Sequence, residues 1–187
     1  MKLDDRDRTI ISMYSSNPNV SQEEIASAVN LSQPSVAARI RKLRSMGALR
    51  NQAGIDPMAM GLYIAKVDLS CNDTSEVLDM FKDCPYFANG LTVSGRNNLC
   101  LFFVSESIST LESIVNHHLR SKQGVKNVDF NIVIGTEKNI TVPIKLTPGG
   151  SKAPPCGINV QCKNCPPFKS NRCSGCPAIG QYQGWLY

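Results

Sequence analysis

Cysteine is the residue type in this sequence whose spacing most directly predicts chemistry. Five of the eight cysteines lie between residues 156 and 176, in the pattern C-x5-C-x2-C-x7-C-x2-C. They are Cys156, Cys162, Cys165, Cys173 and Cys176. Each C-x2-C pair can close a tight turn whose sulfurs meet at one centre, and two such pairs supply four thiolates. The spacing therefore predicts a metal-binding module over residues 156–187.

The spacing leaves two kinds of metal centre open. Tetrahedral zinc bound by the two C-x2-C pairs is the simplest assignment, and it leaves Cys156 spare. An iron–sulfur cluster of the four-iron four-sulfur type is slightly favoured, because Pro166 and Pro177 each follow a cysteine and a fifth cysteine widens the choice of ligands. The alternative without metal is an unstructured or disulfide-linked tail, since the segment is too short to bury a core of its own.

The remaining cysteines and the two histidines carry weaker signals. Cys71, Cys84 and Cys100 are scattered through the middle of the chain, as buried small apolar residues of a reducing compartment usually are. His117 and His118 are adjacent on a predicted helix, where neighbouring side chains point about 100° apart. Because such a pair cannot grip one metal as an i,i+4 pair could, we expect both histidines at the surface.

A second group of side chains suits a phosphate backbone. Between residues 32 and 50 the chain carries five basic residues and no acidic one. The basic residues are Arg39, Arg41, Lys42, Arg44 and Arg50. This charge predicts double-stranded DNA as partner, with Gln33 and Ser35 at base edges and the basic side chains at phosphates. The alternative is an ordinary solvated charged face.

Two short helices must position these side chains. Ser21 and Glu24 form a capping box at the start of the first helix, and Asn30 tolerates the left-handed conformation that ends it. Ser32 caps the second helix, which carries Pro34 in its first turn. The stripe that this helix buries is formed by Val36, Ile40 and Leu43. A helix over residues 3–16 packs against the pair.

At this point the sequence carries a resemblance to a known family. The segments LDDRDRTIISMYSSNP, EEIASAVNLSQPSVAARIRKLRSMGAL and DPMAMG resemble the winged helix-turn-helix half of the Lrp/AsnC family of bacterial and archaeal transcription regulators. The resemblance implies a DNA-binding domain over residues 1–55, in which residues 48–55 form a short hairpin or wing.

The middle of the chain alternates strand and helix patterns. The segments are 62–70, 74–84, 87–95, 99–105, 108–121 and 125–135, in the order βαββαβ. This order predicts an α+β fold: a ferredoxin-like domain over residues 62–146, in which two helices cover one face of a four-stranded antiparallel sheet. The uncovered face predicts a homodimer or a higher homo-oligomer, whose two-fold symmetry would match palindromic operators.

The same resemblance implies an effector site and an assembly role for this domain. In the family, small effectors, commonly amino acids, bind near the turn between the second and third strands, which here is Gly95, Arg96, Asn97 and Asn98. The family pattern places Asp three residues after the Gly, whereas this chain has Asn98. Because a neutral amide replaces a carboxylate, amino-acid sensing does not carry over directly. The alternative is a purely polar hairpin.

Composition excludes several classes of protein. The net charge is +5, the longest purely apolar run, residues 99–104, is too short to span a bilayer, and the mixed charges of MKLDDRDR exclude a secretory signal. We therefore expect a cytoplasmic protein. We find no catalytic constellation and expect no enzyme, so the sequence predicts a transcription regulator modulated by its cysteine module. Two alternatives are an enzyme on the same scaffold, such as a siroheme decarboxylase, and a metal carrier with a vestigial helix-turn-helix.

Overall fold

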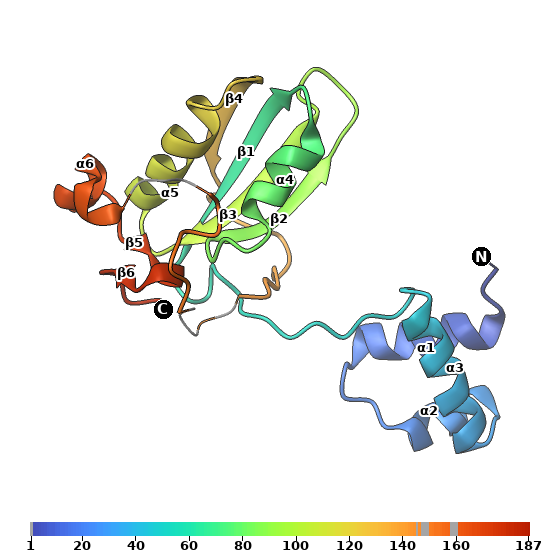
Figure 1. Ribbon diagram of the computed structural model, residues 1–187. Coiled ribbons are helices and arrows are strands. Elements are labelled where there is room, and N and C mark those ends of the chain that lie inside the picture. Colours follow the sequence, from blue (N-terminus) through green and yellow to red (C-terminus); the bar gives the residue numbers. More distant parts are fainter. Residues whose placement is uncertain (1, 145, 147–149, 158–160) are drawn as a thin grey trace. The chain divides into compact units, whose positions relative to one another are not determined.

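The chain folds as two compact units, Met1–Gln52 and Ala53–Tyr187. The computed structural model describes residues 2–144, 146, 150–157 and 161–187. The fold is α+β, with three helices in the first unit and an antiparallel four-stranded sheet with helices in the second (Figure 1). The expected fold class is confirmed. In the described ranges no helix combines the length and the apolar character that crossing a membrane requires.

The first unit is built from α1 (Asp5–Ser16), α2 (Gln22–Val29) and α3 (Gln33–Ser45). Each helix contributes to one apolar core, in which the most deeply buried residues are Ile10, Ile25, Val36, Ile40 and Leu43. Burying a side chain of this size contributes about 1.5–3 kcal/mol. Apolar packing therefore holds the three helices together.

Local signals fix the turn between α2 and α3. The Ser21 hydroxyl accepts the Glu24 amide at 3.1 Å, and the Glu24 carboxylate accepts the Ser21 amide at 2.9 Å, so the expected capping box is confirmed. Asn30 ends α2 with φ at 52°, in the left-handed region, as expected. The chain is thereby turned into α3 within three residues.

Two local expectations are wrong. Ser32 caps no backbone amide of α3, because its hydroxyl lies 2.9 Å from the Ser35 hydroxyl instead. Residues 48–55, all of them described, form no hairpin. Leu49 is buried in the three-helix core, and Ile55 pairs with Val142 in the second unit, so this segment has no partner with which to form a wing.

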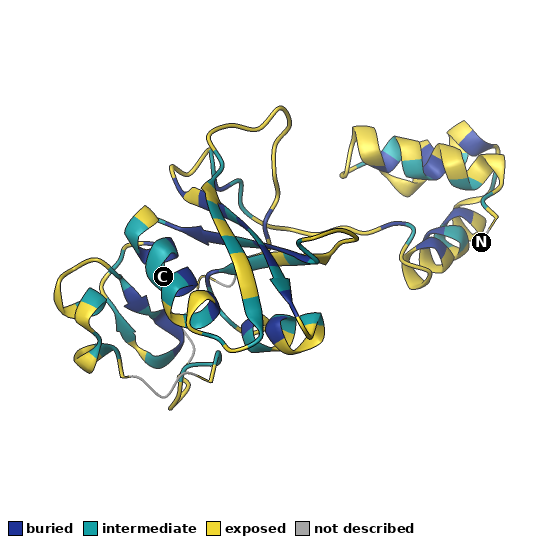
Figure 2. Cartoon of the chain, turned by 90° about the horizontal axis from the view of Figure 1, so that it is seen from above, coloured by how far each residue is buried: buried dark blue, intermediate teal, exposed yellow. Residues whose placement is uncertain are grey.

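The second unit contains the expected ferredoxin-like domain. Its elements are β1 (Tyr63–Cys71), α4 (Thr74–Phe81), β2 (Phe87–Thr92), β3 (Leu99–Ser105), α5 (Ile108–Val115) and β4 (Val125–Ile132). The strand order is β2-β3-β1-β4, and every neighbouring pair is antiparallel. Phe81 of α4 and Leu111 of α5 pack on Phe103 and Val67, so both helices cover one face. Figure 2 shows the two central strands, β1 and β3, largely buried, whereas the edge strands β2 and β4 contain no buried residue.

A π-helical turn, η1 (Asn116–Arg120), continues α5 and carries both histidines. Such turns are rare, and they occur frequently at functional sites because they redirect side chains that an α-helix would point elsewhere. The expected single helix over 108–121 is therefore present, but its last part is wound differently.

The cysteine-rich tail has little regular structure of its own. Its elements are η2 (Cys162–Asn164), α6 (Pro166–Lys169), β5 (Gly175–Cys176), η3 (Pro177–Ile179) and β6 (Gln181–Tyr182). Strands β5 and β6 form a short hairpin. Gly175 has φ at +84°, and a Cβ there would collide with the Gln181 carbonyl, so only glycine fits this position.

The tail packs against the sheet domain rather than forming the separate third domain expected over 156–187. Tyr86 donates to the Gly175 carbonyl at 2.6 Å, and Tyr187 donates to the Pro85 carbonyl at 2.6 Å. Thr110 of α5 accepts the Ser174 amide at 2.9 Å. Residues 145, 147–149 and 158–160 of the expected second domain, linker and tail lie outside the described residues.

Candidate metal centre and nucleic-acid interface

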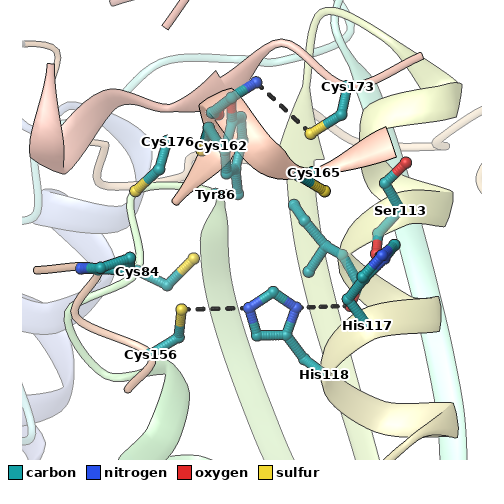
Figure 3. A pocket seen from close by; sticks show the side chains of 13 residues that line it. Cys84, Tyr86, Ser113, His117, His118, Cys156, Cys162, Cys165, Cys173 and Cys176 are labelled. Atoms are coloured by element: carbon teal, nitrogen blue, oxygen red, sulfur yellow. Dashed lines mark hydrogen bonds between the residues drawn. The ribbon is translucent and has the colours of Figure 1, made fainter. Parts of the chain in front are cut away.

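Six of the eight cysteines line one cavity of about 100 Å³ where the tail meets α5 and η1 (Figure 3). They comprise the five cysteines of the tail and Cys84, which lies in the connection between α4 and β2. The lining is completed by residues that include Tyr86, Ile114 and His118. The five cysteines selected by spacing are thus gathered at one place, together with three potential ligands from the sheet domain, Cys84, His117 and His118.

The cysteines are free thiols in a partly desolvated setting. None of the eight, all of which are described, forms a disulfide. Burial raises the pKa of Cys84 to about 12 and that of Cys176 to about 11, and it also raises the pKa of Cys162 and Cys173. These thiols are therefore neutral at pH 7 without metal, and binding a metal would release protons.

His118 is held in a single orientation beside the tail. Its Nδ1 lies 2.8 Å from the Ile114 carbonyl oxygen, and its Nε2 lies 3.1 Å from the sulfur of Cys156. Burial lowers the pKa of His118 to about 4, so the ring is neutral at pH 7. The expectation that both histidines lie at the surface is wrong for His118 and correct for His117, which is exposed.

The donor set fits a metal, although the donors do not yet converge. Thiolates with one imidazole are the ligands that select zinc or iron–sulfur clusters. Among the described residues no group of three or more His, Cys, Asp or Glu side chains lies close enough to hold a metal ion. Zinc–sulfur bonds of 2.3 Å would bring tetrahedral sulfurs to about 3.8 Å from one another. The donors surround a cavity instead, so the side chains must close on any metal that binds.

Sequence reasoning missed Cys84 and His118. Cys84 lies far from the tail along the chain, and no spacing pattern connects it to the C-x2-C pairs. Helical geometry correctly predicted that the two histidines point in different directions, but only the fold shows that His118 contacts a cysteine. The other two middle cysteines, Cys71 and Cys100, are buried away from the cavity, as expected.

The predicted nucleic-acid interface is exposed with one exception. Gln33 and Ser35 are exposed at the beginning of α3. The exposed basic side chains are Arg41, Lys42, Arg44 and Arg50.

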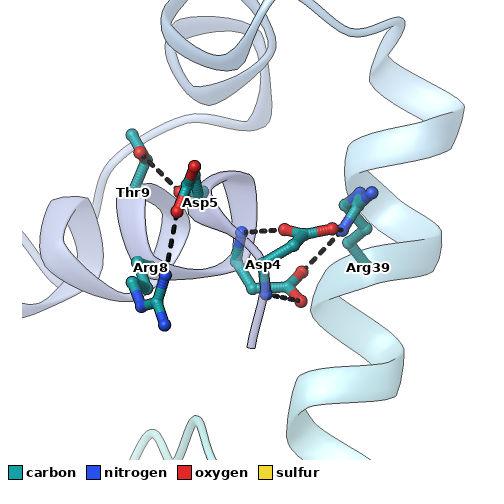
Figure 4. A network of polar contacts seen from close by, with 6 residues as sticks. Asp4, Asp5, Arg8, Thr9 and Arg39 are labelled. Atoms are coloured by element: carbon teal, nitrogen blue, oxygen red, sulfur yellow. Dashed lines mark hydrogen bonds and ion pairs between the residues drawn. The ribbon is translucent and has the colours of Figure 1, made fainter. Parts of the chain in front are cut away.

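Arg39 is the exception, because two carboxylates of its own unit bind it. Its guanidinium contacts Asp4 and Asp7 at 2.7 Å each (Figure 4). Asp4 is the N-cap of α1, and its hydrogen bonds with the Asp7 amide and with Arg39 lower its pKa. This arrangement ties α1 to α3 and neutralises Arg39, so we remove Arg39 from the expected phosphate contacts.

The expected effector turn connects β2 to β3, and much of it is committed to structure. The Asn98 side chain accepts the Cys71 amide at 2.9 Å and donates to the Cys71 carbonyl at 2.8 Å. Asn97 donates to Asp129 at 3.2 Å. The amide of Asn98 therefore replaces a backbone pair at the end of β1 and is unavailable to an effector. A small-molecule site at Gly95, Arg96 and Asn97 stays a prediction.

Comparisons with known proteins show similarity to transcription regulators over most of both units. Residues 3–50 match the family model described as winged helix-turn-helix DNA-binding. The chain is 27% identical over 148 residues to the HTH-type transcriptional regulator FL11 of Pyrococcus horikoshii, and the match covers 76% of this chain and 97% of FL11. About a quarter of this chain thus lies outside that match.

Solved structures agree in fold. Escherichia coli AsnC has a TM-score of 0.64 and 14% identity, over 76% of this chain and 99% of AsnC. The leucine response regulatory protein LrpA of Mycobacterium tuberculosis has a TM-score of 0.63 and 24% identity, over 73% of this chain and 96% of LrpA. At these identities the likeness establishes the fold of the matched part.

Proposed function

We propose that this chain, a DNA-binding transcription regulator with the fold of the Lrp/AsnC proteins, has its DNA binding modulated by a metal centre in the cysteine-lined cavity. One observation carries the proposal: every cysteine of the tail lines the same cavity on the sheet domain. A metal bound there would act on the domain to which the tail is docked.

The DNA-binding arrangement follows from α3. In a helix-turn-helix the second helix lies in the major groove, and its N-terminal residues contact base edges. Gln33 and Ser35 stand at that end of α3 and are exposed. The phosphate contacts are Arg41, Lys42, Arg44 and Arg50.

Two copies of the chain form a dimer, whose two-fold symmetry would match that of a palindromic DNA operator. The support is the part of the sheet face opposite α4 and α5 that the chain itself leaves open, since Val142 and Leu186 cover this face only around Ile64 and Val104. Gly90 faces Leu78 of α4, so its neighbour Leu91 points to the opposite face, where it is 47% exposed. Light scattering of the purified chain is expected to give the mass of a dimer or larger assembly. A monomer at the concentrations that bind DNA would contradict this arrangement.

The metal centre is an iron–sulfur cluster. Six cysteines spread around a cavity exceed the four that zinc uses, and they do not meet at one point. Bound there, a cluster would supply the regulator with a one-electron redox input. Anaerobic purification followed by iron, sulfide and zinc analysis tests this assignment. A colourless chain that holds one zinc would overturn the cluster.

The coupling between metal and DNA is tested by gel shifts. We expect the affinity of the chain for DNA from its own upstream region to differ by at least about fivefold between metal-loaded protein and the Cys162→Ser, Cys165→Ser double variant, which is the lower end of ordinary coupling energies. If the two proteins bind DNA with equal affinity, under both oxidising and reducing conditions, the tail has only a structural role. Failure of both proteins to bind any DNA would favour a metal carrier.

A further inference from the structure

We propose that Nε2 of His118 and the sulfur of Cys84 are metal ligands supplied by the sheet domain, so that the metal bonds the tail to the end of α5. The inference rests on the proposed function only in requiring that the cavity binds a metal. It adds two ligands that cysteine spacing does not predict, and it places the metal on the domain rather than within the tail alone.

The hydrogen bonds of His118 leave one ring nitrogen suited to a metal. A carbonyl oxygen can only accept, so the contact of 2.8 Å between Nδ1 and the Ile114 oxygen requires a proton on Nδ1. In the neutral ring Nε2 then carries the lone pair. Metal-binding histidines usually donate their other N–H to a carbonyl or carboxylate, which fixes the ring as it is fixed here.

The lone pair of His118 is aimed at the nearest tail cysteine. Nε2 lies 3.1 Å from the sulfur of Cys156, which donates its S–H to the ring. Two ligands of one tetrahedral metal, with bonds of about 2.05 Å to nitrogen and 2.3 Å to sulfur, stand roughly 3.6 Å apart. If a metal replaced the proton between these two atoms, the distance from Nε2 of His118 to the sulfur of Cys156 would therefore increase only slightly.

Cys84 is a rigid donor on the same side of the cavity. Its amide donates to the Phe81 carbonyl at 2.9 Å, and its carbonyl accepts the Phe87 amide at 3.0 Å, so a tight turn holds its backbone. Figure 3 shows its sulfur beside that of Cys156. One wall of the cavity therefore already carries three possible metal donors, which are Cys84, Cys156 and His118.

His118 lies in the π-helical turn and also contacts the core of the sheet domain. Within η1 the His118 ring also packs on Phe81, with ring centroids 5.7 Å apart, and Phe81 is fully buried in the sheet core. A metal bound to His118 is therefore one side chain away from the packing between α4 and the sheet. His118 and Cys84 are fixed by the domain, whereas the tail cysteines must close on them.

The test is pulsed electron paramagnetic resonance on the reduced, full-length chain grown with ¹⁵N-histidine. A bound imidazole is expected to give a nitrogen hyperfine coupling that the label changes. His118→Ala is expected to abolish the coupling, and His118→Cys is expected to abolish it while retaining the metal. His117→Ala is the matched control: His117 also lines the cavity, and its Nδ1 makes the same kind of bond, at 2.9 Å to the Ser113 carbonyl, but it is exposed, and among the described residues only His118 contacts a cysteine.

A wild-type spectrum without histidine coupling would overturn the assignment of His118, even if the cluster is present. If the chain holds zinc instead, the cluster fails but this inference is still tested, because the cobalt-substituted protein reports the same nitrogen. Cys84→Ala is expected to lower metal affinity at least tenfold, whereas Cys100→Ala, a buried cysteine away from the cavity, leaves it unchanged. Equal affinity in both variants would remove Cys84 from the ligands.

Discussion

The three-helix unit and the cysteine-rich tail are stabilised in different ways. In the first unit, side chains such as Ile10, Ile25 and Val36 are completely buried. In the tail, the buried apolar side chains among described residues are small or few, with Ala178 and Leu186 the examples. Hydrophobic burial stabilises the first unit, whereas we expect the tail to depend on its docking and on the proposed metal. The predictions below test that contrast.

Metal removal is expected to have the largest effect, and only on the tail. Structural zinc sites in small peptides contribute on the order of 10 kcal/mol of binding free energy, which is folding free energy for a segment without a core. After chelation under reducing conditions, hydrogen exchange should accelerate by orders of magnitude in residues 161–187 and stay unchanged in residues 5–45. Equal protection of the tail before and after chelation would break the contrast.

Truncating a side chain in the core of the first unit is expected to destabilise that unit and to leave the tail unchanged. Ile25→Ala removes a fully buried side chain of α2 and should lower the free energy of unfolding of the first unit by about 2–5 kcal/mol. Thermal unfolding followed by hydrogen exchange would report this loss, together with loss of DNA binding. Metal content should be unchanged; a parallel loss of metal would mean that the two regions are coupled.

Charge removal at α3 is expected to act on DNA binding without affecting either fold. Lys42→Ala should weaken binding to all sequences alike and reduce the slope of log affinity against log salt by about one unit. Arg39→Ala is the comparison, because Arg39 is already paired with Asp4 and Asp7. Its salt slope should match the wild type; a slope reduced equally in both variants would return Arg39 to the phosphate contacts.

The smallest effect concerns the ion pair between α1 and α3. The pKa of Asp4 is lowered below its ordinary value of 3.8, so its contribution to stability is present above that value and is lost as the pH falls below it. Asp4→Asn keeps a good N-cap but removes the charge. We expect a slightly lower melting temperature for this variant at pH 7 and a difference from the wild type that shrinks steadily as the pH is lowered below 3.8. A difference that stays constant as the pH falls would point to the cap instead.

The regular elements could be predicted from local residues. Ser21 with Glu24 fixed the start of α2, and Asn30 fixed its end. Alternation placed β1, and a continuous apolar run placed β3, almost to the residue. The wing was wrong because longer-range contacts decided it, namely burial of Leu49 and the pairing of Ile55 with Val142. The cap at Ser32 was wrong because its hydroxyl contacts the Ser35 hydroxyl instead of a backbone amide.

In the candidate site, too, local sequence predicted some features and only tertiary contacts decided the others. Spacing predicted which tail cysteines would be gathered at one cavity, because the two C-x2-C turns are local geometry. The exposed basic face of α3 was likewise set by helical periodicity. Only the tertiary structure decided that Arg39 is paired internally and that Cys84 and His118 join the tail cysteines. Contacts between residues so far apart along the chain depend on how α4, η1 and the tail pack, and no local pattern encodes that packing.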